Sequence, residues 1–289
     1  MKRRQVLIGW LFVLPFVLVV FFFLVLPLIY AGYLSSQADS LVGGQHFVGI
    51  TNYIDTFKDP LFLEGLKRVA IYALISIPIM LSVSLASALT IDVIQTRLAR
   101  VFRLIAFMPY AVPGVVAALM WGFLYSQQFG PIYWFAKKLG YPNLDMFDPK
   151  IFIYSISGIA FWAWTGYNMI VLYSALQGIS REIYEAAIVD GASQKQIAFR
   201  IKIPAIRGAI VLTVLFSLIG SMQLFTEPRI LSRYTNAVTL GYTPNIYAFN
   251  LAFNQSQFNY SAAVSFALGL IVLVVSYGFL LRSRRMADK

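Results

Sequence analysis

Six long apolar runs constrain the fold of this 289-residue chain more than any other feature. A helix needs roughly 20 residues to cross about 30 Å of hydrocarbon, and each run reaches that length. In addition, 59% of the residues are hydrophobic and only 12% are charged, which leaves too little polar surface for a soluble globule. We therefore expect an all-α, polytopic membrane helical bundle that forms a single domain over residues 1–289. The six expected transmembrane helices cover about 7–30, 69–91, 101–126, 152–176, 205–226 and 261–281.

The distribution of lysine and arginine predicts the orientation of the bundle, because these residues are retained on the cytoplasmic side of short loops. If Met1 lies inside, most of the 23 basic residues fall in the inner segments. This orientation places both termini in the cytoplasm, together with a polar segment at 177–204. The chain is then a multi-pass membrane protein whose longest inner connection is that segment.

The composition excludes several functions. A net charge of +11 is typical of some nucleic-acid-binding proteins, but these cluster their basic residues on one soluble face, whereas here the basic residues lie at the ends of apolar runs. The chain has no cysteine, and its one histidine, His46, lies in an outer loop. Serine, aspartate and glutamate are not paired at helical spacing within any span. We therefore expect no catalytic residue, no metal site and no nucleic-acid partner, and the chain is not expected to be an enzyme.

The polar segment carries its own helix signals. Ser180 suits the N-cap of a first short helix, and Gly191 suits its C-terminal end. Ser193 and Gln196 have the spacing of a capping box that begins a second helix. Pro204 is expected to end that helix, because proline disfavours a helical conformation in the residue before it. The segment is thus predicted to form two short helices joined by a hinge at Gly191.

The first of these helices has an unusual surface for a solvent-exposed element. It places small residues, Ala186 and Ala187, between the acidic Glu185 and Asp190. Small side chains let another surface approach closely, and acidic ones direct the register of a contact. Alternatively, the alanines are simply good helix formers and the segment is an ordinary connection between spans. The pattern alone leaves both interpretations open.

The same stretch resembles the EAA loop of binding-protein-dependent ABC importer permeases. The resemblance is carried by Glu185-Ala186-Ala187-x-x-Asp190-Gly191-Ala192, followed by Phe199, Ile201 and Ile203-Pro204. This pattern is specific at its length and in its position between membrane spans. It implies the architecture of an ABC type I importer permease with a cytoplasmic coupling helix, in the prokaryotic plasma (inner) membrane.

Further motifs extend the resemblance along most of the chain, toward permeases of disaccharide and oligosaccharide importers such as those for maltose, lactose and cellobiose. They are Phe47-Val48-Gly49-Ile50-x-Asn52-Tyr53 with Asp59-Pro60 in the first outer loop, Pro109-x-x-x-Pro113 through Trp121 in the third span, Gln223-x-Phe225, and the region from Ala248-Phe249 to Tyr260-x-Ala262-Ala263. Pro109 and Pro113 are also the strongest kink candidates. One turn departs from the group, since Thr226-Glu227-Pro228-Arg229 stands where many members have Thr-x-Gly-Gly-Pro.

The resemblance also implies partners and roles. A second homologous permease, a cytoplasmic ATPase dimer and an extracytoplasmic sugar-binding protein are expected to assemble with the chain. Glu185 would meet a basic residue of the ATPase, Ala186 and Ala187 would enter its groove, and Gly191 would permit the bend. Asp190 would cap or pair locally, and Ala192 and Pro204 complete the coupling motif. The chain has no G-x-x-x-x-G-K-[ST] loop, so ATP and magnesium are expected on the partner ATPase and no cofactor in this chain.

Candidate substrate-pathway residues lie in the fourth and fifth spans. Trp164, Tyr167 and Asn168 lie in the fourth span, and Gln223 and Glu227 lie near the end of the fifth. Aromatic faces, hydroxyls and amides are the groups that bind neutral sugars. Alternatively, the aromatic residues form interfacial belts and Asn168 makes an interhelical hydrogen bond. Both interpretations stay open from the sequence.

We therefore expect the permease subunit of an ATP-driven importer that translocates a di- or oligosaccharide by alternating access. An ion-coupled secondary sugar carrier is the main alternative. Such a carrier typically holds charged residues or histidines within its spans. The central parts of all six apolar runs lack charged residues, which favours the ATP-driven class.

Overall fold

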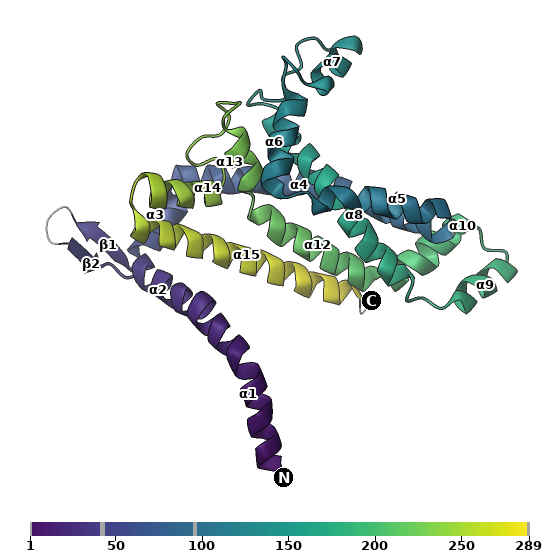
Figure 1. Ribbon diagram of the computed structural model, residues 1–289, viewed down its shortest axis with the longest axis horizontal. Helices are drawn as coiled ribbons and strands as arrows, with labels where there is room; N and C mark the ends of the chain where they lie inside the picture. Colours follow the sequence, from purple (N-terminus) through teal and green to yellow (C-terminus); the bar gives the residue numbers. More distant parts are fainter. Residues whose placement is uncertain (1, 41–43, 95–96, 288–289) are drawn as a thin grey trace. The chain divides into compact units, whose positions relative to one another are not determined.

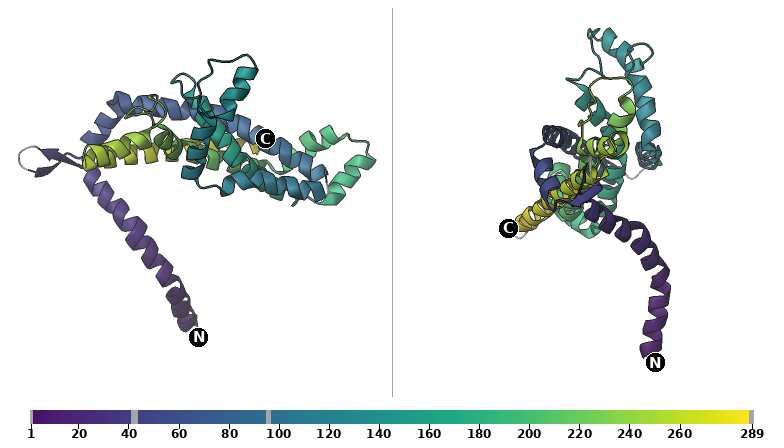
Figure 2. Two further views of the ribbon diagram at one scale, coloured as in Figure 1. Left: turned by 45° about the horizontal axis from the view of Figure 1, so that its top comes forward. Right: turned by 90° about the vertical axis from the view of Figure 1, so that its left-hand side faces the viewer.

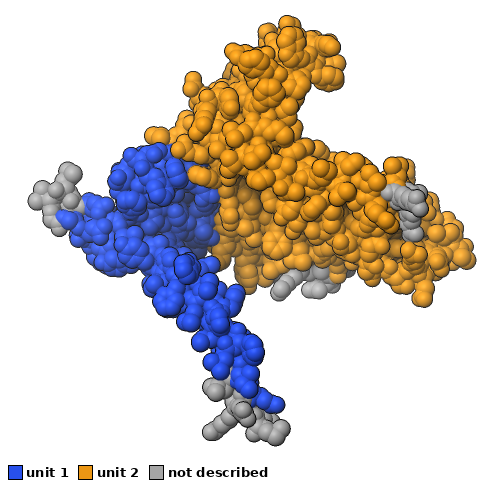
Figure 3. Space-filling view, viewed as in Figure 1, with its two compact units in different colours: residues 1–63, 244–271 blue, residues 64–243, 272–289 orange. Residues whose placement is uncertain are grey.

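The computed structural model describes residues 2–40, 44–94 and 97–287, and these residues are predominantly helical (Figure 1). They form two compact units (Figure 3): unit 1 contains residues 1–63 and 244–271, and unit 2 contains residues 64–243 and 272–289. The predicted all-α fold class is confirmed. The prediction of one domain over the whole chain stays a prediction, and Met1 and residues 288–289 lie outside the described part.

Unit 1 begins with a long helical run. This run consists of α1 (Lys2–Val20), a π-helical turn η1 (Phe21–Val25) and α2 (Leu26–Ser35). An antiparallel hairpin that the sequence did not predict follows, with strands β1 (Gln37–Ser40) and β2 (Gly44–Phe47) and Gln37 opposite Phe47. The unit also contains α3 (Thr51–Lys58), the start of α4 (Pro60–Val93), α14 (Pro244–Phe249), the π-helical η4 (Asn250–Asn254) and the first part of α15 (Phe258–Ala287).

The first outer-loop motif fastens the hairpin to α3. The buried Asn52 amide donates hydrogen bonds to the Ser35 carbonyl at 2.9 Å and to the Gln37 carbonyl at 2.8 Å. The hydroxyls of Tyr53 and Ser35 lie 2.7 Å apart. Gly49 has φ +61°, a conformation that favours glycine because it has no Cβ. These residues therefore hold the chain reversal between α2 and α3.

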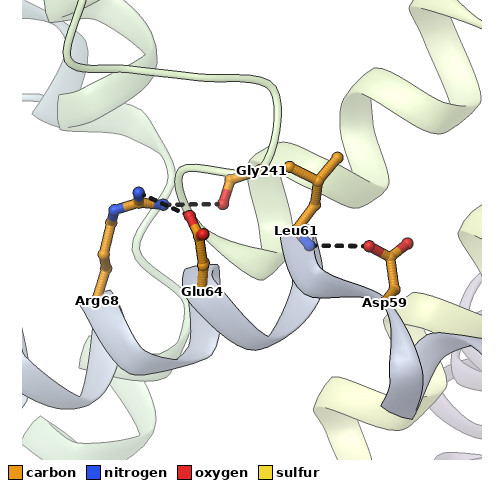
Figure 4. Close-up of polar contacts among 5 residues, drawn as sticks. All are labelled: Asp59, Leu61, Glu64, Arg68 and Gly241. Atoms are coloured by element: carbon orange, nitrogen blue, oxygen red, sulfur yellow. Dashed lines mark hydrogen bonds and ion pairs between the residues drawn. The ribbon is translucent and has the colours of Figure 1, made fainter.

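The Asp59-Pro60 pair begins α4 (Figure 4). The Asp59 carboxylate accepts a hydrogen bond from the Leu61 N–H at 2.9 Å, while Pro60 occupies the first helical position. The same carboxylate accepts hydrogen bonds from the hydroxyls of Tyr247 and Tyr260, the latter at 3.0 Å. One acidic side chain thus joins the start of α4 to α14 and α15 within unit 1.

Unit 2 contains the remaining helices. They are the rest of α4, α5 (Arg97–Phe107), the 3-10 turn η2 (Met108–Ala111), α6 (Gly114–Tyr125), α7 (Pro131–Lys138), α8 (Phe152–Leu176), α9 (Arg181–Val189), α10 (Gln194–Gln196), the π-helical η3 (Ile197–Lys202), α11 (Ile203–Ala205), α12 (Arg207–Met222), α13 (Thr226–Leu231) and the end of α15. Helices α5 and α8 lie side by side in both figures (Figures 1 and 2).

The core of unit 2 lies where α4, α5 and α8 meet. Ser84 of α4 reinforces this contact by donating a hydrogen bond to the Thr165 carbonyl of α8 at 2.8 Å. The Arg68 guanidinium, in the first half of α4, lies 3.1 Å from the Glu64 carboxylate and 3.5 Å from the Gly241 carbonyl (Figure 4). The buried apolar side chains of the core are Ala88, Ile91, Ala99, Met169, Leu172, Leu176 and Ile206.

The third predicted span is broken. Residues 98–111 and 114–125 form two helical arms that meet at 98°, with Pro109 and Pro113 at the break. Proline donates no main-chain N–H and its ring crowds the preceding turn, so the helix cannot continue through both. The predicted kink is confirmed, and the predicted span over 101–126 stays a prediction.

Four helical segments of the described chain are long and apolar enough to cross a membrane, or five if the bent pair is one span. They are Ile8–Ser35, Pro60–Val93, Arg207–Leu231 and Phe258–Ser283. Helix α8 occupies the fourth predicted span but is not one of these four segments, and many of its residues are buried. The expected number of six spans therefore stays a prediction.

Candidate functional site

Helix α9 carries the Glu185-Ala186-Ala187 motif on an exposed element. Ser180 is its N-cap residue, although the serine hydroxyl makes no capping hydrogen bond. At the other end, Gly191 has φ +83°, and the turn is closed by a hydrogen bond from the Ala192 N–H to the Ala187 carbonyl at 2.9 Å. The predicted helix and its glycine turn are both present.

The second short helix begins as predicted and ends differently. The Ser193 side chain and the Gln196 side chain form the reciprocal hydrogen bonds of a capping box. The chain then continues through η3 and α11, and Ile203 is helical at φ −61° and ψ −48°. The helical run ends at Ala205, one residue after Pro204, but the prediction that the residue before Pro204 is not helical is wrong. A π-helical turn precedes this proline, which stands near the start of α11 where its missing N–H is tolerated.

The exposed surface of α9 contains both polar and apolar side chains. Glu185, Ala186 and Asp190 are exposed, while Ala187 is half-buried. Sequence reasoning did not anticipate how much apolar surface accompanies them, since Val189 is 86% exposed and Ile188 54% exposed. Large exposed apolar side chains beside small and acidic ones are features of a contact surface for another protein.

A polar cluster lies beneath α9. Lys202 of η3 forms an ion pair with Asp92, near the end of α4, and both side chains are only 7% exposed. The Gln177 amide donates to the other Asp92 carboxylate oxygen at 2.7 Å. The Lys202 ammonium lies 4.7 Å from the centre of the Tyr184 ring. Burial, and then the Asp92 carboxylate, raise the pKa of the Tyr184 hydroxyl, so this ring stays neutral beside the cation.

Glu185 lies at the edge of the same cluster. A cavity of about 240 Å³ is lined by Glu185 and Arg181 of α9 together with Asp92, Gln177, Tyr184 and Lys202. The motif glutamate is therefore exposed on one side and borders a polar cavity on the other. A basic side chain of another protein could approach it there without crossing apolar surface.

A second cavity, of about 250 Å³, brings together all five predicted substrate-pathway residues. Trp164, Tyr167 and Asn168 enter it from α8, and Gln223 and Glu227 lie near the α12–α13 junction. Three further groups of its wall were not predicted. They are Tyr72, Ser76, Ile77 and Met80 of α4, Ser217 of α12, and Leu224 and Phe225 between α12 and α13.

Aromatic rings form one part of this wall. The Trp164 and Tyr167 rings meet edge to face, with centroids 5.9 Å apart. Tyr110, at the break between α5 and α6, stacks on Tyr167 at 4.6 Å. Trp164 remains 45% exposed. The rings are therefore braced by one another and still present a face to a ligand.

Asn168 lies at the cavity wall and also makes an interhelical contact, while its role in the substrate pathway stays a prediction. It lines the cavity, and its buried amide also lies 3.4 Å from the Met80 sulfur of α4, a weak interhelical hydrogen bond. Glu227 is the one acidic residue among the described residues of the wall, which include no lysine or arginine. The cavity therefore offers rings, amides, hydroxyls and one carboxyl group.

The model of a family described as "Binding-protein-dependent transport system inner membrane component" matches residues 62–286. The chain belongs to this family. The lactose transport system permease protein LacF of Rhizobium radiobacter is 32% identical over 96% of this chain and 94% of its own length. The trehalose/maltose transport system permease protein MalF of Thermococcus litoralis is 26% identical over 100% of this chain and 97% of its own length.

A solved structure shares the fold of this family member. A bacterial alginate ABC transporter, crystallised in complex with an alginate pentasaccharide-bound periplasmic protein, contains a chain that matches with a TM-score of 0.84. The match covers 100% of this chain and 97% of that one, at 20% identity. The predicted ABC importer permease architecture is thereby confirmed.

Two features of this family member were not visible in its sequence. The departure at Thr226-Glu227-Pro228 begins helix α13, which packs against α6. The second feature is the ion pair of Asp92 with Lys202. They are 110 residues apart, and no local pattern marks such a pair.

Proposed function

We propose that this family member is the permease subunit of an ATP-driven importer that translocates a di- or oligosaccharide delivered by an external binding protein. The observation that carries the proposal is the cavity that gathers Trp164, Tyr167, Asn168, Gln223 and Glu227. Sugars present apolar ring faces and many hydroxyls. Aromatic faces with a few convergent polar groups suit such ligands. The names of the relatives, which include lactose and trehalose/maltose permeases, support the same class of cargo.

The size of the cavity supports a sugar site that this chain shares with a second permease. Its volume of about 250 Å³ lies just below the range of about 300–1,000 Å³ that is usual for ligand pockets. In this conformation there is room for part of an oligosaccharide. A second, homologous permease would supply the facing wall, and closure of the two around the sugar would complete the site.

The energy is proposed to come from a separate ATPase dimer that holds ATP and magnesium. With the orientation predicted from lysine and arginine, both termini and α9 face the cytoplasm. The exposed residues Glu185, Ala186, Ile188 and Val189 would contact the ATPase, and Gly191 would let α9 tilt as the ATPase closes. Movement of α9 would then alternate access to the cavity between the two sides of the membrane.

The first test combines purification with transport. The chain would be purified gently from its native membrane, and its partners and their stoichiometry identified by native mass spectrometry. The recovered complex would be reconstituted in liposomes and tested for uptake of radiolabelled lactose, maltose and trehalose, with ATP inside or with an ion gradient. ATP-dependent uptake by a complex with an ATPase pair and a second permease supports the proposal. Recovery of the chain alone, with uptake that follows an ion gradient, would replace it with a secondary sugar carrier.

A further inference from the structure

We infer that the buried Asp92–Lys202 ion pair is the connection that transmits movement of α9 to α4, and through α4 to the cavity. The inference rests on the proposed function, because it names the residues that would carry ATPase movement to the sugar. The two residues are positioning residues, since neither touches the cavity lined by Trp164 and Asn168.

Helix α9 has little other contact with the bundle. None of its residues is buried, and Tyr184 and Ala187 are the two that are half-buried. The Tyr184 ring is the side chain that lies over the Lys202 ammonium, at 4.7 Å. A cation beside an aromatic face is attracted by the ring quadrupole, and more strongly when it is shielded from water. Movement of α9 must therefore displace Lys202 or break this contact.

Lys202 is held at its other side by α4. Its ammonium is paired with Asp92, and the Gln177 amide at the end of α8 fixes the second Asp92 carboxylate oxygen at 2.7 Å. Both charged side chains are 7% exposed, so water screens their attraction far less than at a surface. Separating the pair would leave two buried charges without partners, which is strongly unfavourable. These three side chains and the Tyr184 ring are therefore expected to move as a unit.

Helix α4 joins this unit to the cavity. It is helical from Pro60 to Val93, and Met80, Ser76 and Tyr72 all line the cavity. At 1.5 Å of rise per residue, Met80 lies about 18 Å from Asp92 along the helix. Between these two residues α4 contains no proline or glycine, so a shift at Asp92 is carried along the helix to Met80. Displacement of α9 would thus reposition the α4 side of the cavity, including Met80, which contacts Asn168.

The test separates a transmitting role from a merely stabilising one. The double variant Asp92→Asn/Lys202→Met removes both charges at nearly constant size, so no buried charge is left unpaired. It would be assembled into the full complex and reconstituted, and both ATP hydrolysis and uptake of the transported probe sugar measured. We expect normal amounts of complex and a fall of about tenfold in sugar taken up per ATP hydrolysed. Lys202→Arg, which retains the pair, should keep most of the coupling.

Lys195→Met is the matched control, because it makes the same change on an exposed residue of the same segment. It should leave uptake per ATP unchanged. Wild-type coupling in the double variant would overturn the inference, as would an equal loss in the control.

A distance measurement keeps the inference testable if the double variant assembles poorly. The chain has no cysteine, so Thr90→Cys on α4 and Glu182→Cys on α9 place two unique spin labels on exposed positions outside the proposed ATPase contact. In the otherwise wild-type chain we expect one narrow distance distribution, which broadens when Asp92 and Lys202 are neutralised. An unchanged distribution would overturn the inference. If the unaltered complex showed no ATP-dependent uptake, the proposed function would fail instead, and the label distances would still report whether the pair holds α9 to α4.

Discussion

Gly166 of α8 lies directly against the main chain of Ala106 in α5. A Cβ at Gly166 would lie 1.6 Å from the Ala106 carbonyl oxygen and 2.4 Å from its carbonyl carbon. These are main-chain atoms, which cannot rotate away as the end of a flexible side chain can. The two helices therefore approach this closely because residue 166 has no side chain, as small residues permit between membrane helices.

We predict that Gly166→Ala destabilises the permease by more than about 3 kcal/mol, beyond the usual cost of overpacking, because the helices must separate. The measurement is the thermal unfolding midpoint of the isolated chain in detergent. Gly269→Ala is the control, since a Cβ at this helical glycine of α15 meets no atom within 4 Å. It should leave stability unchanged or raise it by up to about 1 kcal/mol, because alanine favours a helix more than glycine does. Equal midpoints for the two variants would show that the α5–α8 contact is looser than described.

We predict that Asp59→Asn costs about 1–3 kcal/mol of stability, because an amide has one acceptor oxygen where the carboxylate serves three donors. The Leu61 N–H and the hydroxyls of Tyr247 and Tyr260 all bond to this side chain. Unfolding midpoints of the isolated chain measure the effect. Asp55→Asn, on an exposed residue of α3, is the matched control and should be near neutral. A neutral Asp59→Asn would mean that this carboxylate does not hold unit 1 together.

We predict that Glu185→Lys lowers sugar uptake by about tenfold while the chain still inserts into the membrane, because it reverses the charge on the surface proposed to meet the ATPase. Uptake and ATP hydrolysis by the reconstituted complex are the readouts. Glu182→Lys makes the same change in the first turn of the same exposed helix and should have a much smaller effect. Normal uptake by the Glu185 variant would remove this residue from the coupling surface.

We predict that Gln223→Ala and Asn168→Ala each lower uptake by about three- to tenfold, the effect of losing a hydrogen bond to the sugar, without preventing assembly. The measurement is the initial uptake rate of the transported probe sugar at fixed concentrations of sugar and binding protein. Gln128→Ala changes an exposed outer-loop glutamine and is the control. Unchanged rates in both cavity variants would exclude these two residues from the sugar pathway.

Several features could be predicted from the sequence because their causes are local. The length of an apolar run can be read from the sequence of that segment alone, and it predicts a membrane-spanning helix. The break at Pro109 and Pro113, the left-handed Gly191 and the capping box of Ser193 and Gln196 each depend on residues a few positions apart. Even so, the local rule for the residue before proline was wrong here, because Ile203 is helical and the helical run ends only at Ala205.

The tertiary structure decided which distant residues meet. Nothing near Asp92 or Lys202 in the sequence marks them as a buried pair, and Gly166 resembles other helical glycines until α5 is packed against it. The five substrate-pathway residues were chosen by residue type, but only the crossing of α4, α8 and the α12–α13 junction places them around one cavity. Residue type and spacing determine the free energy of a single helix in water or lipid. Which buried charges, rings and main-chain atoms touch depends on how helices separated along the chain pack together.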